Sequence, residues 1–356
     1  MRVLITGNLG YVGSALAAHL RAVLPATELL GYDAGFFAHC ITAGGPAPET
    51  GLASQYFGDV RDLPASLLTG VDAIVHLAAI SNDPMGNRFE AVTEEINTGA
   101  SLRLAALAAQ AGVRSFVFAS SCSIYGRADA SSRRESDSTC PLTAYARSKV
   151  ATEQSLKGMN LDNMAVTCLR FATACGMSSR LRLDLVLNDF AASALATGEI
   201  VVLSDGTPWR PLIEVSDMGR AIEWAINRDP RDGGRCLMVN VGSDAWNFQV
   251  KDLANAVAAS LPGTRVSINE AAPPDNRSYR VDFSLFRELA PRHQPQSGLE
   301  QTIARLVAGL RGMDFRDGDF RNSSLMRLKV LERLIDEGHL SASLRWRLPP
   351  VQDLAA

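Results

Sequence analysis

The N-terminal residues contain the feature that most constrains the fold. A short apolar run at residues 3–5 is typical of a buried parallel strand. Residues 14–24 have helical character and end before Pro25. Between them lie three glycines at three-residue spacing: Gly7, Gly10 and Gly13. Such glycines let a backbone turn approach a pyrophosphate, and the helix N-terminus supplies free N–H groups. The pattern predicts a dinucleotide-binding unit whose contacts are made by Gly7, Gly10, Tyr11, Val12 and Gly13.

An acidic residue follows at the distance that such a unit requires. The next apolar strand ends at Asp33, about 20 residues beyond Gly13. A carboxylate there accepts hydrogen bonds from the adenosine ribose hydroxyls and repels a 2′-phosphate, which favours NAD over NADP. The alternative is that Asp33 is only a turn residue at the end of a strand.

The chain then alternates strand and helix as far as Arg170. Further apolar strands are predicted at residues 71–79, 115–119 and 165–170, and another at 236–241. Because each strand is apolar throughout, the fold class is α/β, a Rossmann-type doubly wound parallel sheet. We expect an NAD-binding domain at residues 1–170, with a returning segment at about 212–242. Residues 171–211 and 243–356 would form a smaller, mostly helical, C-terminal substrate-binding domain.

Further cofactor contacts are expected where these strands end. Asp59 could accept a hydrogen bond from the adenine amino group while Val60 packs against the ring; a turn with a helix cap at Asp62 is the alternative. Small residues at 77–79 leave room for a cofactor across the strand edge, and His76 is assigned a packing role. The remaining candidates of this group are Leu77, Ala78, Ala79 and, on a helix expected at 90–111, Asn97.

Tyr145 and Lys149 are the candidate chemical centre. They stand four residues apart on a helix that runs to about Gly158, so they share one face. The spacing alone is weak evidence, but a serine cluster precedes it at Ser120, Ser121 and Ser123. A free tyrosine titrates near pH ~10 and is a poor base unless a cation stabilises its phenolate. Lys149 is placed to supply that cation.

Composition excludes several other classes of function. The 356 residues carry a formal net charge of −3, which gives no reason to expect nucleic acid or an anionic membrane as a partner. Six cysteines are scattered without zinc-ligand spacing, so we expect no metal and reduced thiols in the cytoplasm. No apolar run approaches the roughly 18–20 residues of a membrane span.

Together these motifs resemble those of extended short-chain dehydrogenases/reductases. Over roughly residues 1–285, their order is similar to that of the nucleotide-sugar epimerase/dehydratase group, the relatives of UDP-galactose 4-epimerase. The resemblance rests on the glycine turn, Asp33, Asp59-Val60, Leu77-Ala78-Ala79, Ser120-Ser121-x-x-Ile124-Tyr125-Gly126 and Tyr145-x-x-x-Lys149. It implies NAD as cofactor and Tyr145 as the catalytic acid/base. Lys149 would bind the nicotinamide ribose and lower the pKa of Tyr145, and Ser121 would hydrogen-bond the reacting sugar hydroxyl.

The resemblance also implies substrate contacts in the second half of the chain. Asn188 would contact the sugar diphosphate, and Arg210, Arg277 and Tyr279 would lie near the nucleotide. Ser123 is a further substrate candidate; the alternative is a structural role for Ser120 and Ser123, and a one-residue error in the alignment would exchange these roles. The alternatives are a helix polar face for Asn188 and a surface salt bridge for Arg210.

The chain departs from the group where 4,6-dehydratases carry an Asp-Glu pair, because Cys122 and Ser123 stand there. Dehydration would therefore lack its acid and base. We expect an NAD-dependent nucleotide-sugar epimerase that oxidises a ring carbon, most simply C4, and returns the hydride. The alternative is a net sugar-nucleotide dehydrogenase or 4-keto reductase. A non-catalytic nucleotide-binding protein is disfavoured by the intact serine, tyrosine and lysine. The resemblance implies a homodimer through the helices at 90–111 and 142–158.

Overall fold

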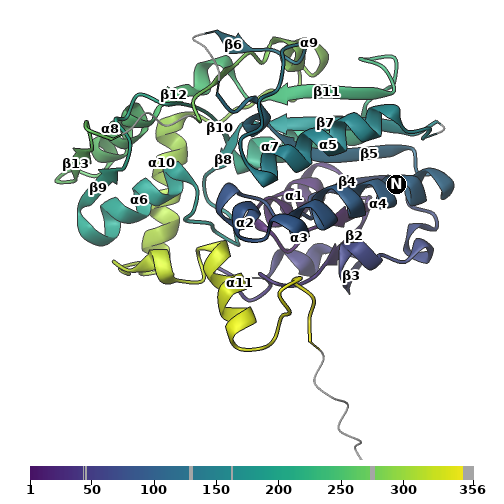
Figure 1. The fold of residues 1–356 in the computed structure, drawn as a ribbon, viewed down its shortest axis with the longest axis horizontal. Helices are drawn as coiled ribbons and strands as arrows, with labels where there is room; N and C mark the ends of the chain where they lie inside the picture. The colour runs from purple at the N-terminus through teal and green to yellow at the C-terminus, as the bar shows by residue number, and fades with distance from the viewer. Residues whose placement is uncertain (43, 45, 128–130, 162, 273–276, 348–356) are drawn as a thin grey trace, which may run out of the picture.

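A seven-stranded, fully parallel sheet forms the centre of the molecule (Figure 1). The structure is a computed structural model and describes residues 1–42, 44, 46–127, 131–161, 163–272 and 277–347. The strand order is β11-β7-β5-β4-β1-β2-β3. The bounds of these strands are β1 Arg2–Thr6, β2 Glu28–Asp33, β3 Ser54–Phe57, β4 Ala73–His76, β5 Ser115–Ser121, β7 Ala165–Phe171 and β11 Cys236–Val241. The predicted doubly wound sheet is therefore confirmed.

Helices cover both faces of this sheet, because alternate side chains of each strand point to opposite sides. Val3 and Ile5 of β1 pack in one cluster with Leu16, whereas Leu4 packs in another with Leu104. The first face is covered by α1 Tyr11–Val23 and α7 Val215–Asn227. The second face is covered by α2 Asp83–Arg88, α3 Glu90–Glu94, α4 Ser101–Gln110 and α5 Ala144–Gly158.

The helix predicted at 90–111 differs from the prediction, and helix α7 is capped by the carboxylate that precedes it. The helix expected over 90–111 contains a wider π-helical turn, η4 Glu95–Ala100, between α3 and α4. At α7, the cap is the Glu214 carboxylate, which accepts from Ser216 N at 2.8 Å. Asp217 instead accepts from the backbone N–H groups of Gln296 and Ser297. The remaining short helices are η1 Pro48–Gly51, η2 Val60–Asp62, η3 Ala65–Leu68, η5 Cys122–Tyr125, η6 Asp244–Trp246 and η7 Phe320–Asn322.

A second group of elements lies beside the carboxyl ends of the strands (Figure 1). Its three-stranded sheet contains β8 Thr173–Cys175, β10 Trp209–Glu214 and β12 Asn247–Gln249. One short pair is formed by β9 Glu199–Val202 and β13 Arg265–Ile268. The other short pair is formed by β6 Ser132–Arg133 and β14 Arg280–Val281. Its helices are α6 Val186–Thr197, α8 Val250–Ser260, α9 Ser284–Leu289 and α10 Leu299–Gly312. Because α10 packs on both α6 and α8, these elements share a core of their own.

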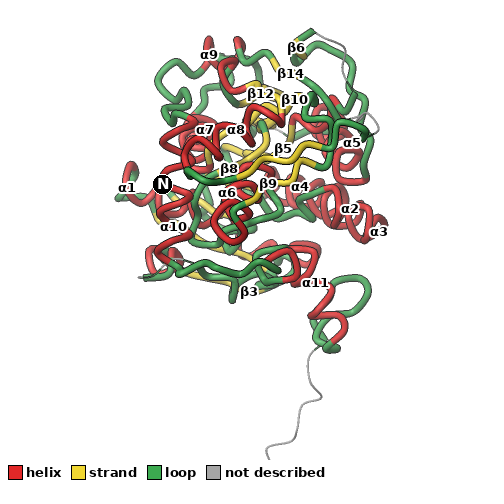
Figure 2. Tube along the Cα trace, turned by 90° about the vertical axis from the view of Figure 1, so that its left-hand side faces the viewer, coloured by secondary structure: helices red, strands yellow, loops and turns green. Residues whose placement is uncertain are grey.

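The C-terminal part returns to the parallel sheet. Helix α11, Arg327–Asp336, packs against α2 and the second-face cluster, and the chain after it runs beside the edge at β2 and β3 (Figures 1 and 2). Within the described ranges, no helix is long and apolar enough to cross a membrane.

Candidate functional site

A cavity of about 1200 Å³ lies between the strand ends and the second group of elements. Residues from the phosphate turn, the ends of β2 to β5 and helix α5 all line it. The predicted site residues that line the cavity are Gly7, Gly10, Tyr11, Val12, Gly13, Asp33, Asp59, Val60, Leu77, Ala78, Ala79, Ser121, Ser123, Tyr145, Lys149, Arg210, Arg277 and Tyr279. The sequence candidates thus converge on one space.

The glycine turn fits a bound dinucleotide. Gly7 has φ +75, and a Cβ there would lie 2.6 Å from the backbone N of Ala78. A Cβ at Gly13 would lie 2.5 Å from the carbonyl oxygen of Gly7. Helix α1 begins at Gly10, which has no side chain to cap it, so the first backbone N–H groups are available to an anion. Residues with a side chain at Gly7 or Gly13 would therefore collide with the backbone of this turn.

Asp33 supports the turn from the end of β2. Its Oδ2 accepts from Leu9 N at 3.0 Å and its Oδ1 from Gly35 N at 2.7 Å. Burial raises the pKa of the Asp33 carboxyl, and these two hydrogen bonds partly offset the rise. The carboxylate therefore holds the turn and also lines the cavity, so its two sequence interpretations are compatible.

Tyr145 faces the cavity two residues inside α5. The helix is capped by Thr143, whose Oγ1 accepts from Ala146 N at 3.2 Å. Burial raises the pKa of the Tyr145 phenol to about 12, while a hydrogen bond with Ser121 acts in the opposite direction. Ser121 Oγ also accepts from Ser123 N at 3.1 Å. The direction of the tyrosine shift is opposite to the one expected from the sequence.

Lys149 lies beneath Tyr145 and is 3% exposed. Its Nζ donates to the Ala119 carbonyl at 2.7 Å and lies 5.5 Å from the Tyr145 ring centroid. Burial lowers the pKa of Lys149 to about 8, although the charge of Glu153 opposes this. Because the ammonium is directed to a carbonyl and not to the phenol oxygen, it does not offset the effect of burial on Tyr145.

Two predicted contacts lie outside the cavity lining. Asn97 is 1% exposed and is held by Ile80 and Ser148: its Oδ1 accepts from Ile80 N, and its Nδ2 donates to Ile80 O and Ser148 Oγ. Asn188 is fully buried; its Oδ1 accepts from Gly176 N and its Nδ2 donates to Arg182 O. Both amides are used inside the protein, so in this structure they support the cavity wall and do not face a ligand.

The other substrate candidates surround the far end of the cavity. Arg277 forms an ion pair with Asp83, Nη1 to Oδ2 at 3.5 Å. Arg210 donates to the Trp209 carbonyl at 2.9 Å, and burial raises the pKa of Tyr279. Ser123 Oγ is buried and has no hydrogen-bond partner among the described residues. An unpartnered hydroxyl at a cavity wall is a suitable group for binding a polar substrate.

Sequence reasoning missed a buried ion pair in the same wall. Arg182 and Asp184 are joined at 2.8 Å, and Arg182 also donates to Ser81 Oγ at 3.2 Å. Burial favours the neutral acid, but Arg182 holds the pKa of Asp184 below its ordinary value. The charge of Arg182 also acts to lower the pKa of Tyr145. The sequence feature that could have indicated this ion pair is the alternation of two charged residues with leucines from Leu181 to Leu185.

Asp59 has a structural role in addition to its cavity position. It caps η2, with Oδ1 accepting from Arg61 N at 2.9 Å, so the cap is here and not at Asp62. Its carboxylate also binds the Arg61 guanidinium. Burial opposes ionisation, but Arg61 lowers the pKa of Asp59 below its ordinary value.

No group of three or more His, Cys, Asp or Glu side chains within the described part of the chain could hold a metal ion.

Comparisons with known proteins agree with this site. The model of the "NAD dependent epimerase/dehydratase family" matches residues 3–242. A UDP-glucose 4-epimerase of Azospirillum brasilense is 30% identical over 299 residues, covering 77% of this chain and 82% of the relative.

Two solved structures are similar over nearly their whole length. One is a UDP-glucose-4-epimerase from Stenotrophomonas maltophila with NAD and formylated UDP-arabinopyranose (TM-score 0.75, 25% identity, 88% of this chain and 99% of that one). The other is TunA, an NAD-dependent NDP-hexosamine 5,6-dehydratase of tunicamycin biosynthesis (TM-score 0.75, 25% identity, 89% and 99%). Each alignment leaves about a tenth of the present chain unmatched.

Proposed function

Because this chain belongs to the NAD-dependent epimerase/dehydratase family, we propose that it is a nucleotide-sugar epimerase that oxidises and re-reduces a sugar ring carbon, C4 in the simplest case. One observation carries the proposal: Ser121, Tyr145 and Lys149 line the same cavity as the phosphate turn. A hydroxyl-bearing substrate in that space would therefore meet both an acid/base and the nicotinamide site. The similarity to UDP-glucose 4-epimerases supports a UDP-sugar as the first substrate to test.

The phosphate turn and Asp33 would hold the cofactor at its pyrophosphate and adenosine ribose. Bound NAD supplies the hydride acceptor and donor. Ser121 Oγ would orient the substrate hydroxyl, and the Tyr145 oxygen would take its proton. Since the pKa of Tyr145 is raised to about 12, the phenolate needs a cation close to its oxygen. Arg182 already acts in this direction, and Lys149, with Nζ 5.5 Å from the Tyr145 ring centroid, is a second candidate cation.

The cavity is less suited to dehydration. Cys122 is fully buried, and its Sγ donates to the Arg170 carbonyl at 3.0 Å, so it cannot replace an acid at the substrate. The cavity-lining carboxylates Asp83, Asp184 and Asp189 are paired with Arg277, Arg182 and Arg321. Arg182 lowers the pKa of Asp184, so this carboxyl stays ionised and is a poor proton donor. Burial raises the pKa of Asp189, although Arg321 opposes the rise. TunA nevertheless makes an elimination product an outcome worth measuring.

The experiment is a screen of UDP-, dTDP-, GDP- and CDP-hexoses with the purified protein and no added nicotinamide cofactor. Product stereochemistry is read by NMR and reduced nicotinamide by absorbance. The proposal expects a C4 epimer without accumulation of NADH. In parallel reactions with added NAD, one NADH formed per oxidised sugar would establish the net dehydrogenase instead. An unsaturated or deoxy product would establish a dehydratase.

A homodimer through α4 and α5, and a cytoplasmic location, belong to the same proposal. Helix α5 carries Tyr145, so pairing of two copies along it would fix the catalytic helix in both. Sedimentation velocity tests the dimer: a monomer at micromolar concentration with full turnover would contradict it.

A further inference from the structure

The described part of the chain ends in a tight hairpin beside the cavity. Residues 339–347 turn back on themselves: Ser341 N donates to the Arg345 carbonyl at 2.9 Å, and Leu340 forms an antiparallel bridge with Trp346. Leu344 lies at the tip, has φ +53 and is fully buried in the cluster on the second face of the sheet. A left-handed leucine costs roughly 1–2 kcal/mol, so surrounding contacts must hold this conformation. We name residues 339–347 the C-terminal hairpin.

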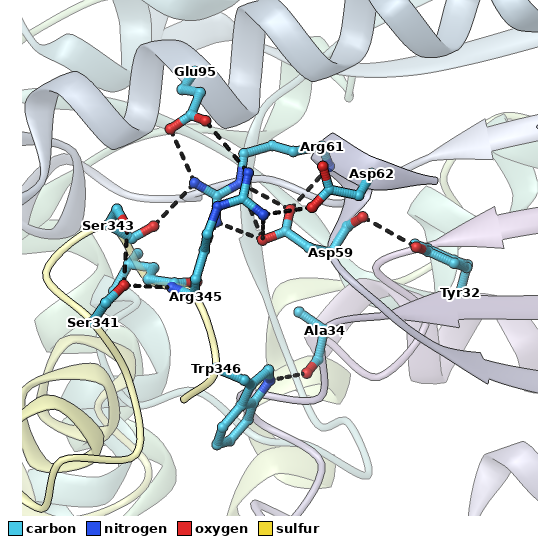
Figure 3. Close-up of polar contacts among 11 residues, drawn as sticks. Tyr32, Ala34, Asp59, Arg61, Asp62, Glu95, Ser341, Ser343, Arg345 and Trp346 are labelled. Carbon is cyan, nitrogen blue, oxygen red and sulfur yellow. Dashed lines mark hydrogen bonds and ion pairs between the residues drawn. The ribbon is translucent and has the colours of Figure 1, made fainter. Parts of the chain in front are cut away.

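Two arginines join this hairpin to the loop after β3 (Figure 3). Arg61 donates from Nη1 to the Ser343 carbonyl at 3.0 Å and from Nη2 to the Leu344 carbonyl at 3.3 Å. Arg345 of the hairpin binds Asp62 and approaches Asp59 at 4.0 Å. Both guanidinium groups lie between Asp59 and Glu95 (Figure 3).

The hairpin reduces the excess of negative charge at this wall. Asp59, Asp62 and Glu95 bring three negative charges, and Arg61 supplies one positive charge. Arg345 supplies the second and also helps to lower the pKa of Asp59. Asp59 is the most buried of the three carboxylates, with its side chain 20% exposed, so removal of Arg345 would affect it most.

Trp346 makes the second attachment, to the loop after β2. Its Nε1 donates to the Ala34 carbonyl at 2.6 Å (Figure 3), and its ring lies 5.7 Å from that of Phe36. Ala34, Phe36 and Asp59 all line the cavity. The hairpin therefore touches both loops that form the end of the cavity assigned to adenosine, without itself being among the lining residues.

We propose that the C-terminal hairpin is a clasp that fixes the adenosine-binding wall, with Arg345 and Trp346 as positioning residues, and so slows release of NAD. This inference rests on the proposed role of the cavity. It also fits that role, because a redox-neutral epimerase reuses one cofactor molecule and gains from its retention.

The test compares two fluorescent ligands that share the reduced nicotinamide. NADH contains adenosine, whereas reduced nicotinamide mononucleotide does not. In the double variant Arg345→Ala/Trp346→Ala, the dissociation rate of NADH should rise roughly tenfold, and that of the mononucleotide should not change. Arg347→Ala is the matched control: it removes an exposed arginine of the same hairpin whose guanidinium makes no contact among the described residues, and both rates should stay at the wild-type value.

Arg345→Glu supplies a second variant in case the double variant does not fold, because it changes only one half-exposed side chain. It should raise the NADH rate in the same selective manner. Equal changes for both ligands, or none for either, would overturn the clasp. If the wild-type protein binds neither ligand, the proposed function itself fails, so the two failures are distinguishable.

Discussion

At the scale of single residues, chemistry at this site depends on how burial and charge are balanced. Burial raises the pKa of Tyr145 to about 12 and lowers that of Lys149 to about 8. Each shift disfavours the charged form, so the pair as it stands has a neutral phenol beside a cation bound to Ala119. The presence of both residues could be predicted from their spacing. Their protonation could not, because desolvation depends on the residues that pack around them.

Tyr145→Phe removes the proton acceptor and leaves the cavity shape almost unchanged. Turnover should fall by at least about a thousandfold, while NADH dissociation stays at the wild-type rate. Steady-state turnover and the fluorescence chase measure the two effects on one preparation. Retained turnover would remove Tyr145 from the mechanism.

Asp33→Asn tests the choice of cofactor with minimal change in shape. Loss of the negative charge removes repulsion of a 2′-phosphate, so the preference for NAD over NADP should drop roughly tenfold. The amide oxygen still accepts one of the two backbone hydrogen bonds that hold the turn. An unchanged ratio of dissociation constants would contradict the ribose assignment.

The lowered pKa of the buried His76 predicts how the stability of the folded protein depends on pH. His76 lies between Thr6 Oγ1 and Ser101 Oγ, and burial lowers its pKa to about 3. Between pH 3 and 6.5 the unfolded chain therefore binds a proton that the folded chain does not. The free energy of unfolding should fall as pH drops below 6.5, by up to about 1.4 kcal/mol per pH unit. Urea titrations of wild type and His76→Gln compare the slopes; equal slopes would contradict this assignment.

At the scale of elements, the catalytic helix is held by its neighbour. Thr143 caps α5 and also donates to Asp83 of α2 at 2.7 Å. Gly86 of α2 lies so close that an added Cβ would be 3.0 Å from the Tyr145 backbone N. The sequence predicts α5 but not α2, because the turn residues at 81–86 are typical of a loop. It does not predict their contact, because this depends on how the chain packs after strand β4.

Thr143→Ala should therefore affect both stability and catalysis. Loss of the cap costs about 1 kcal/mol, and displacement of Tyr145 should lower kcat about tenfold without a matching change in KM. Thr143→Ser keeps the hydroxyl and should restore both quantities. Chemical unfolding and steady-state kinetics provide the measurements; a stability loss with unchanged kcat would show that α5 does not need this contact.

At the scale of the whole molecule, the parallel sheet and its cofactor turn could be predicted almost completely. Local patterns were sufficient there: apolar strands, glycine spacing, and Asp33 at a strand end. Asn188 and Arg182 show why the second half was harder. A buried amide and a ligand-binding amide have the same sequence signature, and Arg182 acquires its role only when Asp184 and the cavity wall are folded around it. The C-terminal hairpin is still more distant, since Arg345 meets Asp62 across almost the entire chain.

The central claim of the proposed function is that a hydride leaves C4 of the sugar and returns to it on one enzyme molecule. The most direct test follows the hydrogen at C4. UDP-glucose labelled with deuterium at C4 is incubated in ordinary water with the purified protein and no added nicotinamide. The account predicts UDP-galactose that retains the deuterium at C4, with no net formation of NADH, as read by NMR and absorbance. Loss of the label to solvent at C4 would contradict it. So would one equivalent of reduced cofactor per oxidised sugar in a parallel reaction that contains added NAD.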